Sequence, residues 1–430
     1  MDDKYEGIIS RFLRDDERLV LSEEREMPLV FESNGEANLD SLNTFISINS
    51  KKILEYVAKY GAVLFRGFGI ASDEDFENTV LSIKGLRGIS QAFMAEEGRI
   101  HAGKSKFVLH TNAVYKTGGT LYLGGFHSEN YYSSDVPAYI SFCCLEPSLM
   151  GGETGIINME KVYQRLDADL KNKLEKTNFF VCKWLVSDVA NRYKISEELI
   201  EKLCKRFKLP IVGEGRDKFI LLYKPNVFEH PITKKRALQI NLFELQNLNK
   251  ELQKAFMNDY KGKAWFWHRF VWRMPKFILK ILEYIYIMFA SFFYSPKDSI
   301  NILKSKINTF IAARKIISYA PFNKKKVGSL FDDKETKDLA GILRKYYSSC
   351  IWQKGDILLV DNRKVVHAGM PGAGDRLVRA MICNPMDMNY AHEENGVFDC
   401  KERVTDTVGF YMASGQLADE EMDENLSLSN

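Results

Sequence analysis

The sequence is poor in cysteine and carries almost no net charge. Its 430 residues include seven cysteines, and 60 Lys and Arg against 57 Asp and Glu leave a formal charge of +3. Cys143 and Cys144 are adjacent in an apolar run, which indicates buried thiols rather than a disulfide framework, and no CxxC or Cys/His spacing suggests a zinc site. The charge balance argues against a general nucleic-acid-binding protein. The average composition excludes a disordered, collagenous or coiled-coil chain.

The first residues lack the apolar core of a signal peptide. The segment MDDKYEGIISRFLRDDERL is charged throughout, so we expect a cytoplasmic location. Peripheral contact with the inner face of a membrane stays open because of an aromatic segment described below.

Strand patterns dominate on both sides of one helical segment. Apolar runs bounded by Gly or Pro are typical of buried strands, and stretches with apolar residues at helical spacing separate them. This predicts a mainly β fold with flanking helices, a sheet pair or barrel, with strands at 61–68, 138–147, 219–223, 236–243, 349–362 and 376–383 and helices at 73–84, 159–176, 195–207 and 334–347. We expect an N-terminal segment 1–52, a discontinuous core 53–250 and 321–418, a helical insert 251–320 and an acidic tail 419–430.

One histidine and one glutamate stand two residues apart in the motif HSE. In extended backbone the side chains of His127 and Glu129 point to the same side. His367, in DNRKVVHAG after a predicted strand, would complete a set of two histidines and one carboxylate. Such a set leaves three positions open on a non-haem Fe(II) ion. On spacing alone, a hydrogen-bonded loop histidine at 127 and a surface histidine paired with Asp361 at 367 stay open.

Residues suited to holding a dicarboxylate accompany this pattern. Thr154 in GGETG offers a hydroxyl group beside glycine backbone. Arg376 and Arg379 follow His367 along the chain, and a guanidinium group pairs with a carboxylate through two hydrogen bonds. Because the two arginines lie three residues apart in a predicted strand, they should face opposite sides, and only one is expected to enter the pocket.

Longer segments around these residues follow the order of one enzyme family. The segment FHSENYYSSDVPAYISFCCLEPSLMGGETGIIN looks like the metal-binding block of the TauD/TfdA family of Fe(II)/2-oxoglutarate-dependent dioxygenases. It is most similar to the branch found in nonribosomal-peptide and other secondary-metabolite pathways. GAVLFRGF, HPITKKRALQINLF and WQKGDILLVDNRKVVH also resemble family segments, so the resemblance covers about 53–245 and 330–385.

The resemblance implies a double-stranded β-helix (jelly-roll) core that uses Fe(II), 2-oxoglutarate and O2. His127, Glu129 and His367 would bind iron. A carboxylate at position 129 argues against a halogenase. The default outcome is hydroxylation of an unactivated C–H bond with release of succinate and CO2, while desaturation and epimerisation stay open.

The resemblance also assigns the 2-oxoglutarate contacts. Thr154 lies in the family's GG-x-T turn. Arg376 fits the family by its position before AMI, whereas Arg379 fits the family's spacing from the second histidine better. We prefer Arg376 as the anchor of the co-substrate.

The implied substrate is an amino acid, free or tethered to a carrier protein, or a peptide-like metabolite. Residues around the HSE motif are expected on the substrate side, namely His110, Asn112, Tyr115 and Asn130. A hydrophobic or lipid-linked substrate is the alternative. A non-catalytic, membrane-associated binding protein on the same fold is the alternative from another class. No nucleic-acid partner is expected, and homo-oligomer formation stays open.

One segment departs from the charge balance of the whole chain. Residues 261–315 contain eleven Lys and Arg and two acids, a net charge of +9, together with 13 aromatic residues. The apolar run 277–294 is interrupted by Lys280 and Glu283, which would be costly inside a bilayer. Three interpretations compete: a lid or oligomer-interface helix, an interfacial membrane helix through 262–300, and a transmembrane span.

Overall fold

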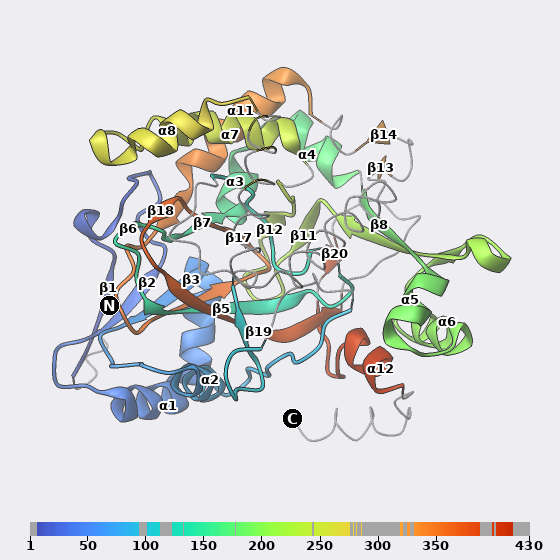
Figure 1. Ribbon diagram of the computed structural model, residues 1–430, viewed down its shortest axis with the longest axis horizontal. Coiled ribbons are helices and arrows are strands. Elements are labelled where there is room, and N and C mark those ends of the chain that lie inside the picture. Colours follow the sequence, from blue (N-terminus) through green and yellow to red (C-terminus); the bar gives the residue numbers. More distant parts are fainter. Residues whose placement is uncertain are drawn as a thin grey trace.

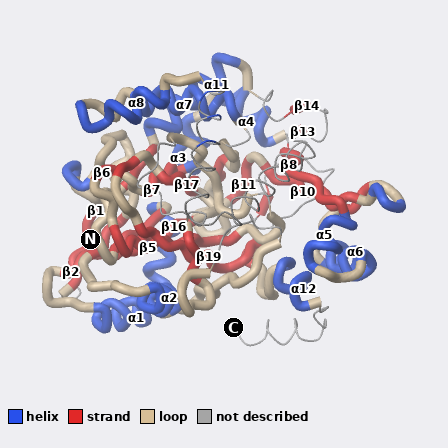
Figure 2. The backbone as a smooth tube through the Cα atoms, in the orientation of Figure 1, coloured by secondary structure: helices blue, strands red, loops and turns tan. Residues whose placement is uncertain are grey.

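Two mainly antiparallel sheets and the helices that cover them make up most of the described chain. The computed structural model describes residues 7–93, 101–111, 123–275 except 132, 177 and 243–244, the positions 278, 281 and 285, and residues 319–320, 325–326, 331–387, 398–399 and 401–415. Figure 2 shows the strands gathered at the centre with helices on the outside.

The main sheet has eight strands, and strands from both ends of the chain meet in it. Its order is β1 (Ile8–Phe12), β2 (Leu29–Ser33), β3 (Ala62–Arg66), β16 (Asp356–Asp361), β5 (Pro137–Glu146), β19 (Leu377–Asp387) and β21 (Lys401–Glu402), with β4 (Val108–His110) also paired to β19. All neighbours are antiparallel except β2 and β3. The expected N-terminal segment 1–52 therefore supplies two strands of the sheet that holds the core.

A smaller antiparallel sheet faces the main sheet. It contains β15 (Tyr347–Ser349), β7 (Thr154–Asn158) and β17 (Val365–Gly369). Phe142 and Val360 of the main sheet belong to the same buried cluster as Ile156 and Val365 of the smaller one. Two antiparallel sheets that enclose one apolar layer form the predicted jelly-roll core, with helices on the flanks. The mainly β fold class is confirmed.

Two helices cover the outer face of the main sheet (Figure 1). α1 (Leu39–Tyr60) begins at Asn38, whose side chain accepts a hydrogen bond from Ser41 N, and α2 (Asp73–Leu81) begins with a Ser72 capping box. α1 ends at Gly61, where φ is +91° and a Cβ atom would lie 2.8 Å from a Val365 methyl group. α1 starts before and ends after the expected boundary at 52/53, because its apolar face packs continuously on the sheet.

Further helices lie beyond the smaller sheet (Figure 1). They are α3 (Met159–Arg165), α4 (Ala168–Glu175), α7 (Gln246–Met257), α8 (Phe266–Trp272) and α11 (Asp333–Lys345). The single helix expected at 159–176 is wrong: Leu166 is extended, and Asp167 caps a second helix through Leu170 N. A side-chain acceptor at Asp167 competes with helical continuation more strongly than apolar spacing suggests.

The remaining elements form a lateral arm and short connections. The strand expected at 236–243 is observed only at Arg236–Leu238 within the described residues. The elements are β6 (Met150–Gly151), β8 (Asn178–Leu185), α5 (Val186–Tyr193), α6 (Glu197–Arg206), β9 (Ile211–Val212), β10 (Phe219–Pro225), β11 (Val227–Glu229), β12 (Arg236–Leu238), β13 (Tyr319–Ala320), β14 (Lys325–Lys326), β18 (Gly372–Ala373), β20 (Phe398–Asp399), α12 (Val408–Ser414) and the 3-10 helices Asp15–Glu17, Gly215–Asp217 and Lys263–Trp265. Cys143 and Cys144 are buried free thiols, as expected.

Candidate metal centre

Three side chains predicted as metal ligands converge between the two sheets. One ligand atom from each of His127, Glu129 and His367 can be chosen so that all lie within 4.8 Å of one another. His367 Nε2 lies 3.4 Å from Glu129 Oε2, and the centroids of the two imidazole rings are 4.6 Å apart. Glu129 and His367 are buried, and His127 is half-buried.

Backbone pairing brings these distant residues together. The main chains of His127 and His367 form an antiparallel bridge, with N–O distances of 3.1 Å and 2.9 Å. β17 is held in turn by β7, where His367 pairs with Ile156. The positions of both histidines are therefore set by main-chain hydrogen bonds, which do not depend on the imidazole groups.

Local contacts orient the two rings. His127 Nδ1 lies 2.8 Å from the carbonyl oxygen of Gly125, so Nδ1 carries the proton that is donated there and Nε2 is directed to the ligand position. The edge of Phe142 packs against the His367 ring at 5.1 Å between centroids. Steric contact and main-chain pairing fix His367, while a hydrogen bond fixes His127.

The donor set fits a divalent non-haem iron. Two neutral imidazoles and one carboxylate on one side of a site form the 2-His-1-carboxylate face, which suits Fe(II) and leaves coordination positions for further oxygen donors. Among the described residues, this is the one cluster of three or more His, Cys, Asp or Glu side chains close enough to hold a metal ion. The chemistry of the donors thus agrees with the motif analysis.

The buried amide of Asn362 holds the HSE segment from behind. Asn362 Oδ1 accepts a hydrogen bond from Glu129 N at 2.7 Å, and Nδ2 donates to the Pro137 carbonyl at 2.8 Å. Asn362 is completely buried. Asn362 was not predicted as a functional residue, although the Asp-Asn pair directly after a predicted strand was the available signal.

Asn362→Ala is expected to weaken Fe(II) binding by about 10- to 100-fold, because the Glu129 backbone loses the group that orients it. Anaerobic metal titration of the variant measures this change. Asn384→Ala is the matched control, since Asn384 is equally buried but bonds Arg87 N and Gly85 O elsewhere in the fold. Unchanged metal affinity in folded Asn362→Ala would contradict the positioning role.

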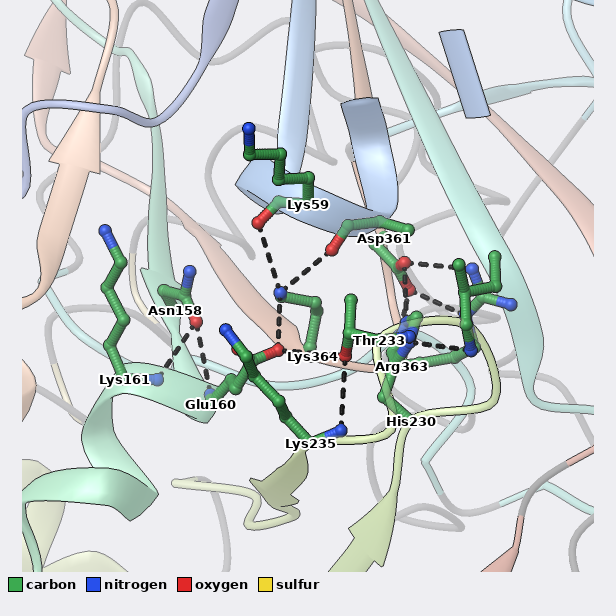
Figure 3. A network of polar contacts seen from close by, with 12 residues as sticks. Lys59, Asn158, Glu160, Lys161, His230, Thr233, Lys235, Asp361, Arg363 and Lys364 are labelled. Atoms are coloured by element: carbon green, nitrogen blue, oxygen red, sulfur yellow. Dashed lines mark hydrogen bonds and ion pairs between the residues drawn. The ribbon is translucent and has the colours of Figure 1, made fainter. Parts of the chain in front are cut away.

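A buried polar network clamps the turn that carries Asn362 (Figure 3). Asp361 accepts hydrogen bonds from His230 Nε2 at 2.9 Å and from Arg363 Nε at 2.8 Å. Burial alone would raise the pKa of the Asp361 carboxyl, but Arg363 and His230 together hold it well below its usual value. Lys364 Nζ donates to Glu160 Oε2 at 2.6 Å. The network joins the HPIT segment to the β16–β17 turn.

A second group of buried residues lies beside Thr154, at the start of β7. Thr154 pairs with Gly369, two residues beyond His367, and it is buried. A Cβ atom at Gly369 would lie 3.8 Å from Arg376 Nη1, and one at Gly152 would lie 3.4 Å from Arg376 Cδ. The Arg376 side chain therefore extends along the GGET turn toward the strand that carries His367.

Burial dominates the electrostatics of this group. It lowers the pKa of Arg376, and it raises the pKa of Glu153 to about 7. Within the described residues, neither Arg376 Nε nor either carboxylate oxygen of Glu153 has a hydrogen-bond partner. Arg376 is half-buried, and a guanidinium group whose buried Nε has unused donor capacity is suited to a carboxylate ligand. Glu153 was not predicted as a functional residue, although it occupies the variable position of the GG-x-T turn.

Arg379 and His110 lie on the opposite face of the main sheet. Arg379 Nε donates to Asp73 Oδ1 of α2 at 2.7 Å, and its Nη1 donates to His110 Nδ1 at 2.8 Å. Arg379 pairs with Cys143, whereas the adjacent Phe142 contacts His367 from the other face. Burial and Arg379 lower the pKa of His110. The structure does not bring Arg379 or His110 to the candidate metal ligands.

The other expected substrate residues have different positions. Asn130 directly follows Glu129 with φ of +52°, and its Nδ2 donates to the Asp135 carbonyl at 3.3 Å. Its side chain thus closes the turn after the HSE motif. Asn112 and Tyr115 lie outside the described residues.

A jelly-roll core with this donor set is typical of mononuclear non-haem iron enzymes. The chain matches the family model "Taurine catabolism dioxygenase TauD, TfdA family" over residues 23–273. It therefore belongs to the TauD/TfdA family of Fe(II)- and 2-oxoglutarate-dependent oxygenases, as the motifs predicted.

Individual known proteins are similar to this chain in sequence or in structure. The dapdiamide synthesis protein DdaC of Enterobacter agglomerans is 28% identical over 142 residues, which are 33% of this chain and 39% of DdaC. A putative alpha-ketoglutarate-dependent taurine dioxygenase from Burkholderia xenovorans is similar with 13% identity and a TM-score of 0.45, covering 91% of this chain and 98% of that one. PvcB from Pseudomonas aeruginosa is similar with 11% identity and a TM-score of 0.44, covering 89% of this chain and 92% of PvcB.

Proposed function

We propose that this chain hydroxylates an unactivated C–H bond of a small amino-acid-like metabolite, free or tethered to a carrier protein. The observation that carries the proposal is the convergence of His127, Glu129 and His367. Bound Fe(II), with 2-oxoglutarate and O2, supplies the two-electron oxidation: one oxygen atom enters the substrate, and the other enters the succinate formed with CO2. The relationship to a dapdiamide synthesis protein supports a secondary-metabolite substrate.

The chain's own residues bind and orient the reactants in this scheme. The three ligand side chains would hold the iron and contribute one negative charge, with Nε2 of His127 directed at the metal by the Gly125 carbonyl. Thr154 and Arg376 would hold 2-oxoglutarate, with the guanidinium paired to its distal carboxylate. Because Arg376 is held among buried groups, that ion pair would be poorly screened by water and correspondingly selective.

Product analysis tests the proposed reaction. The protein is incubated with Fe(II), 2-oxoglutarate, O2 and a panel of amino acids, peptides and carrier-bound amino acids, and succinate and product mass are measured. Substrate-dependent succinate with one added oxygen atom supports hydroxylation. Loss of two hydrogens would instead show desaturation, and an unchanged mass with inverted stereochemistry would show epimerisation. Absence of succinate under all conditions, including without substrate, would favour a non-catalytic binding protein.

A hydrophobic or lipid-linked substrate is the second candidate. One observation favours it, namely the exposed aromatic side chains of α8, which packs near the GGET turn. Lipid-linked amino acids belong in the same substrate panel. Succinate release with these and not with soluble amino acids would select this candidate.

Arg376→Ala is expected to raise the apparent KM for 2-oxoglutarate by roughly 10- to 100-fold, the loss of a charged pair of hydrogen bonds. Arg379→Ala is the matched control, because its guanidinium bonds Asp73 and His110 on the other face. It should leave this KM within about 3-fold while lowering stability. Binding of 2-oxoglutarate to the Fe(II) protein, followed by absorbance without O2, checks the KM result. A larger effect at Arg379 would reverse the assignment.

A further inference from the structure

The inner face of α8 is anchored firmly to the rest of the protein. Trp265, at its start, is buried and packs on Tyr260 with 4.7 Å between ring centroids. His268 is buried and donates from Nε2 to the Gly372 carbonyl at 3.2 Å. A Cβ atom at Gly151 would lie 2.7 Å from the Trp265 ring. These contacts pack one face of the helix on the β6–β18 pair, so its opposite face points away from that pair.

That opposite face carries aromatic side chains in water. Phe266, Trp267 and Phe270 are 54%, 68% and 48% exposed. Their rings contact one another, with centroids 5.4, 6.0 and 6.5 Å apart. A helix on a protein surface normally turns polar residues outward, and a contiguous exposed apolar patch marks an interaction site. The aromatic cluster on α8 has no role in packing the core.

Apolar exposure and positive charge continue along the chain after α8. Ile281 and Ile285, one helical turn apart in residues described as helical, are 54% and 58% exposed. Residues 261–280 contain six Lys and Arg and no acid. Lys261, Lys263 and Arg273 are themselves exposed. Exposed cations therefore flank the aromatic cluster in the described part of this segment.

We propose that the outer face of α8, formed by Phe266, Trp267 and Phe270 with the exposed cations Lys261, Lys263 and Arg273, binds the surface of an anionic phospholipid membrane. Aromatic side chains on one face and cations at its border are the features of a helix that lies in the headgroup region. Within the described residues no helix is long and apolar enough to span a bilayer. Contact at the surface accounts for the cluster without insertion of charged residues into the hydrocarbon.

The charge pattern selects a lipid surface over a second copy of the chain. In a two-fold interface the same patch faces itself, so Lys261, Lys263 and Arg273 would lie opposite the same cations of the other copy. An anionic membrane instead neutralises them. The inference rests on the surface of α8 and not on the chemistry of the metal centre, so it is independent of the proposed reaction.

Vesicle flotation of the full chain tests the proposal. The protein should float with phosphatidylcholine vesicles that contain phosphatidylserine, less with phosphatidylcholine alone, and less again at high salt. Phe266→Ser/Trp267→Ser/Phe270→Ser should lose roughly 10-fold or more of the binding. Lys261→Glu/Lys263→Glu/Arg273→Glu should lose the preference for anionic vesicles.

Ile48→Ser is the matched control, since Ile48 is 75% exposed on α1, away from α8, and its replacement should leave flotation unchanged. Circular dichroism confirms that each variant is folded, and light scattering gives its oligomeric state. Failure of the folded wild-type protein to bind anionic vesicles would overturn the proposal. So would full binding by the aromatic triple variant, or a wild-type dimer that this variant converts to monomers without any vesicle binding.

Discussion

Asp361→Ala is expected to lower the free energy of unfolding by about 3–5 kcal/mol, because it leaves the buried Arg363 guanidinium and the His230 imidazole without their hydrogen-bond acceptor. Asp361 and His230 are completely buried, and Arg363 is 1% exposed. The three side chains are joined by hydrogen bonds of 2.8 to 2.9 Å. Water cannot replace the lost carboxylate at such a depth, so the desolvation cost of the guanidinium becomes uncompensated. Urea unfolding followed by circular dichroism measures the change.

Asp15→Ala provides the contrast for this measurement. Asp15 pairs with Arg25 at the surface, with side chains 65% and 46% exposed, so its removal should cost less than about 1 kcal/mol. Asp361→Asn keeps an oxygen acceptor and is expected to fall between the two. A loss below about 1 kcal/mol in Asp361→Ala would show that the network in Figure 3 contributes little to stability.

The clamp also links stability to the metal centre. Asp361 precedes Asn362, whose amide holds the backbone of Glu129. Lys364, two residues further, is tied to Glu160 and to the Ala58 carbonyl at the end of α1. The turn between β16 and β17 is thus held by contacts of Asp361, Asn362 and Lys364, just ahead of the position where His367 pairs with His127. Residues outside the metal centre therefore help to position its candidate ligands.

The candidate ligand set could be proposed from the sequence because its signals are local. Two-residue alternation places His127 and Glu129 on one side of an extended segment, and a polar DNR turn after an apolar strand delivers His367. The main-chain bridge between the two histidines agrees with that expectation. Arg376 and Arg379 separate as expected, although Arg376 directly precedes β19 and the strand is irregular at Leu377 and Val378.

Other features of the fold and the site depend on pairing between distant segments, which local patterns in a single sequence do not indicate. β4 lies along β19 and carries His110 to Arg379, which no local pattern near position 110 indicates. Glu153 stands between Gly and Thr in a turn, where a charged side chain is usually solvated. It is buried because the turn is covered from distant parts of the chain, including the α8 segment through Trp265. The pairing of β1 and β2 with the main sheet was not predicted either, because β2 and its partner β3 are separated by the whole of α1 in the sequence.

His127→Ala and His367→Ala are each expected to reduce Fe(II)-dependent succinate formation by more than about 100-fold, a larger effect than loss of a group that only orients a ligand. Each removes one of three donors from a site whose ligand atoms lie within 4.8 Å. Metal titration without O2 should show the matching loss of affinity. His110→Ala is the control histidine, since it lies on the far face of the main sheet with Arg379.

The fold should survive both ligand substitutions, and this separates metal loss from unfolding. The bridge between positions 127 and 367 is made by backbone N–H and carbonyl groups, which alanine retains. Circular dichroism spectra and unfolding midpoints of the metal-free variants should therefore stay close to those of the metal-free wild type. Full turnover by either folded variant would exclude the residue as an iron ligand.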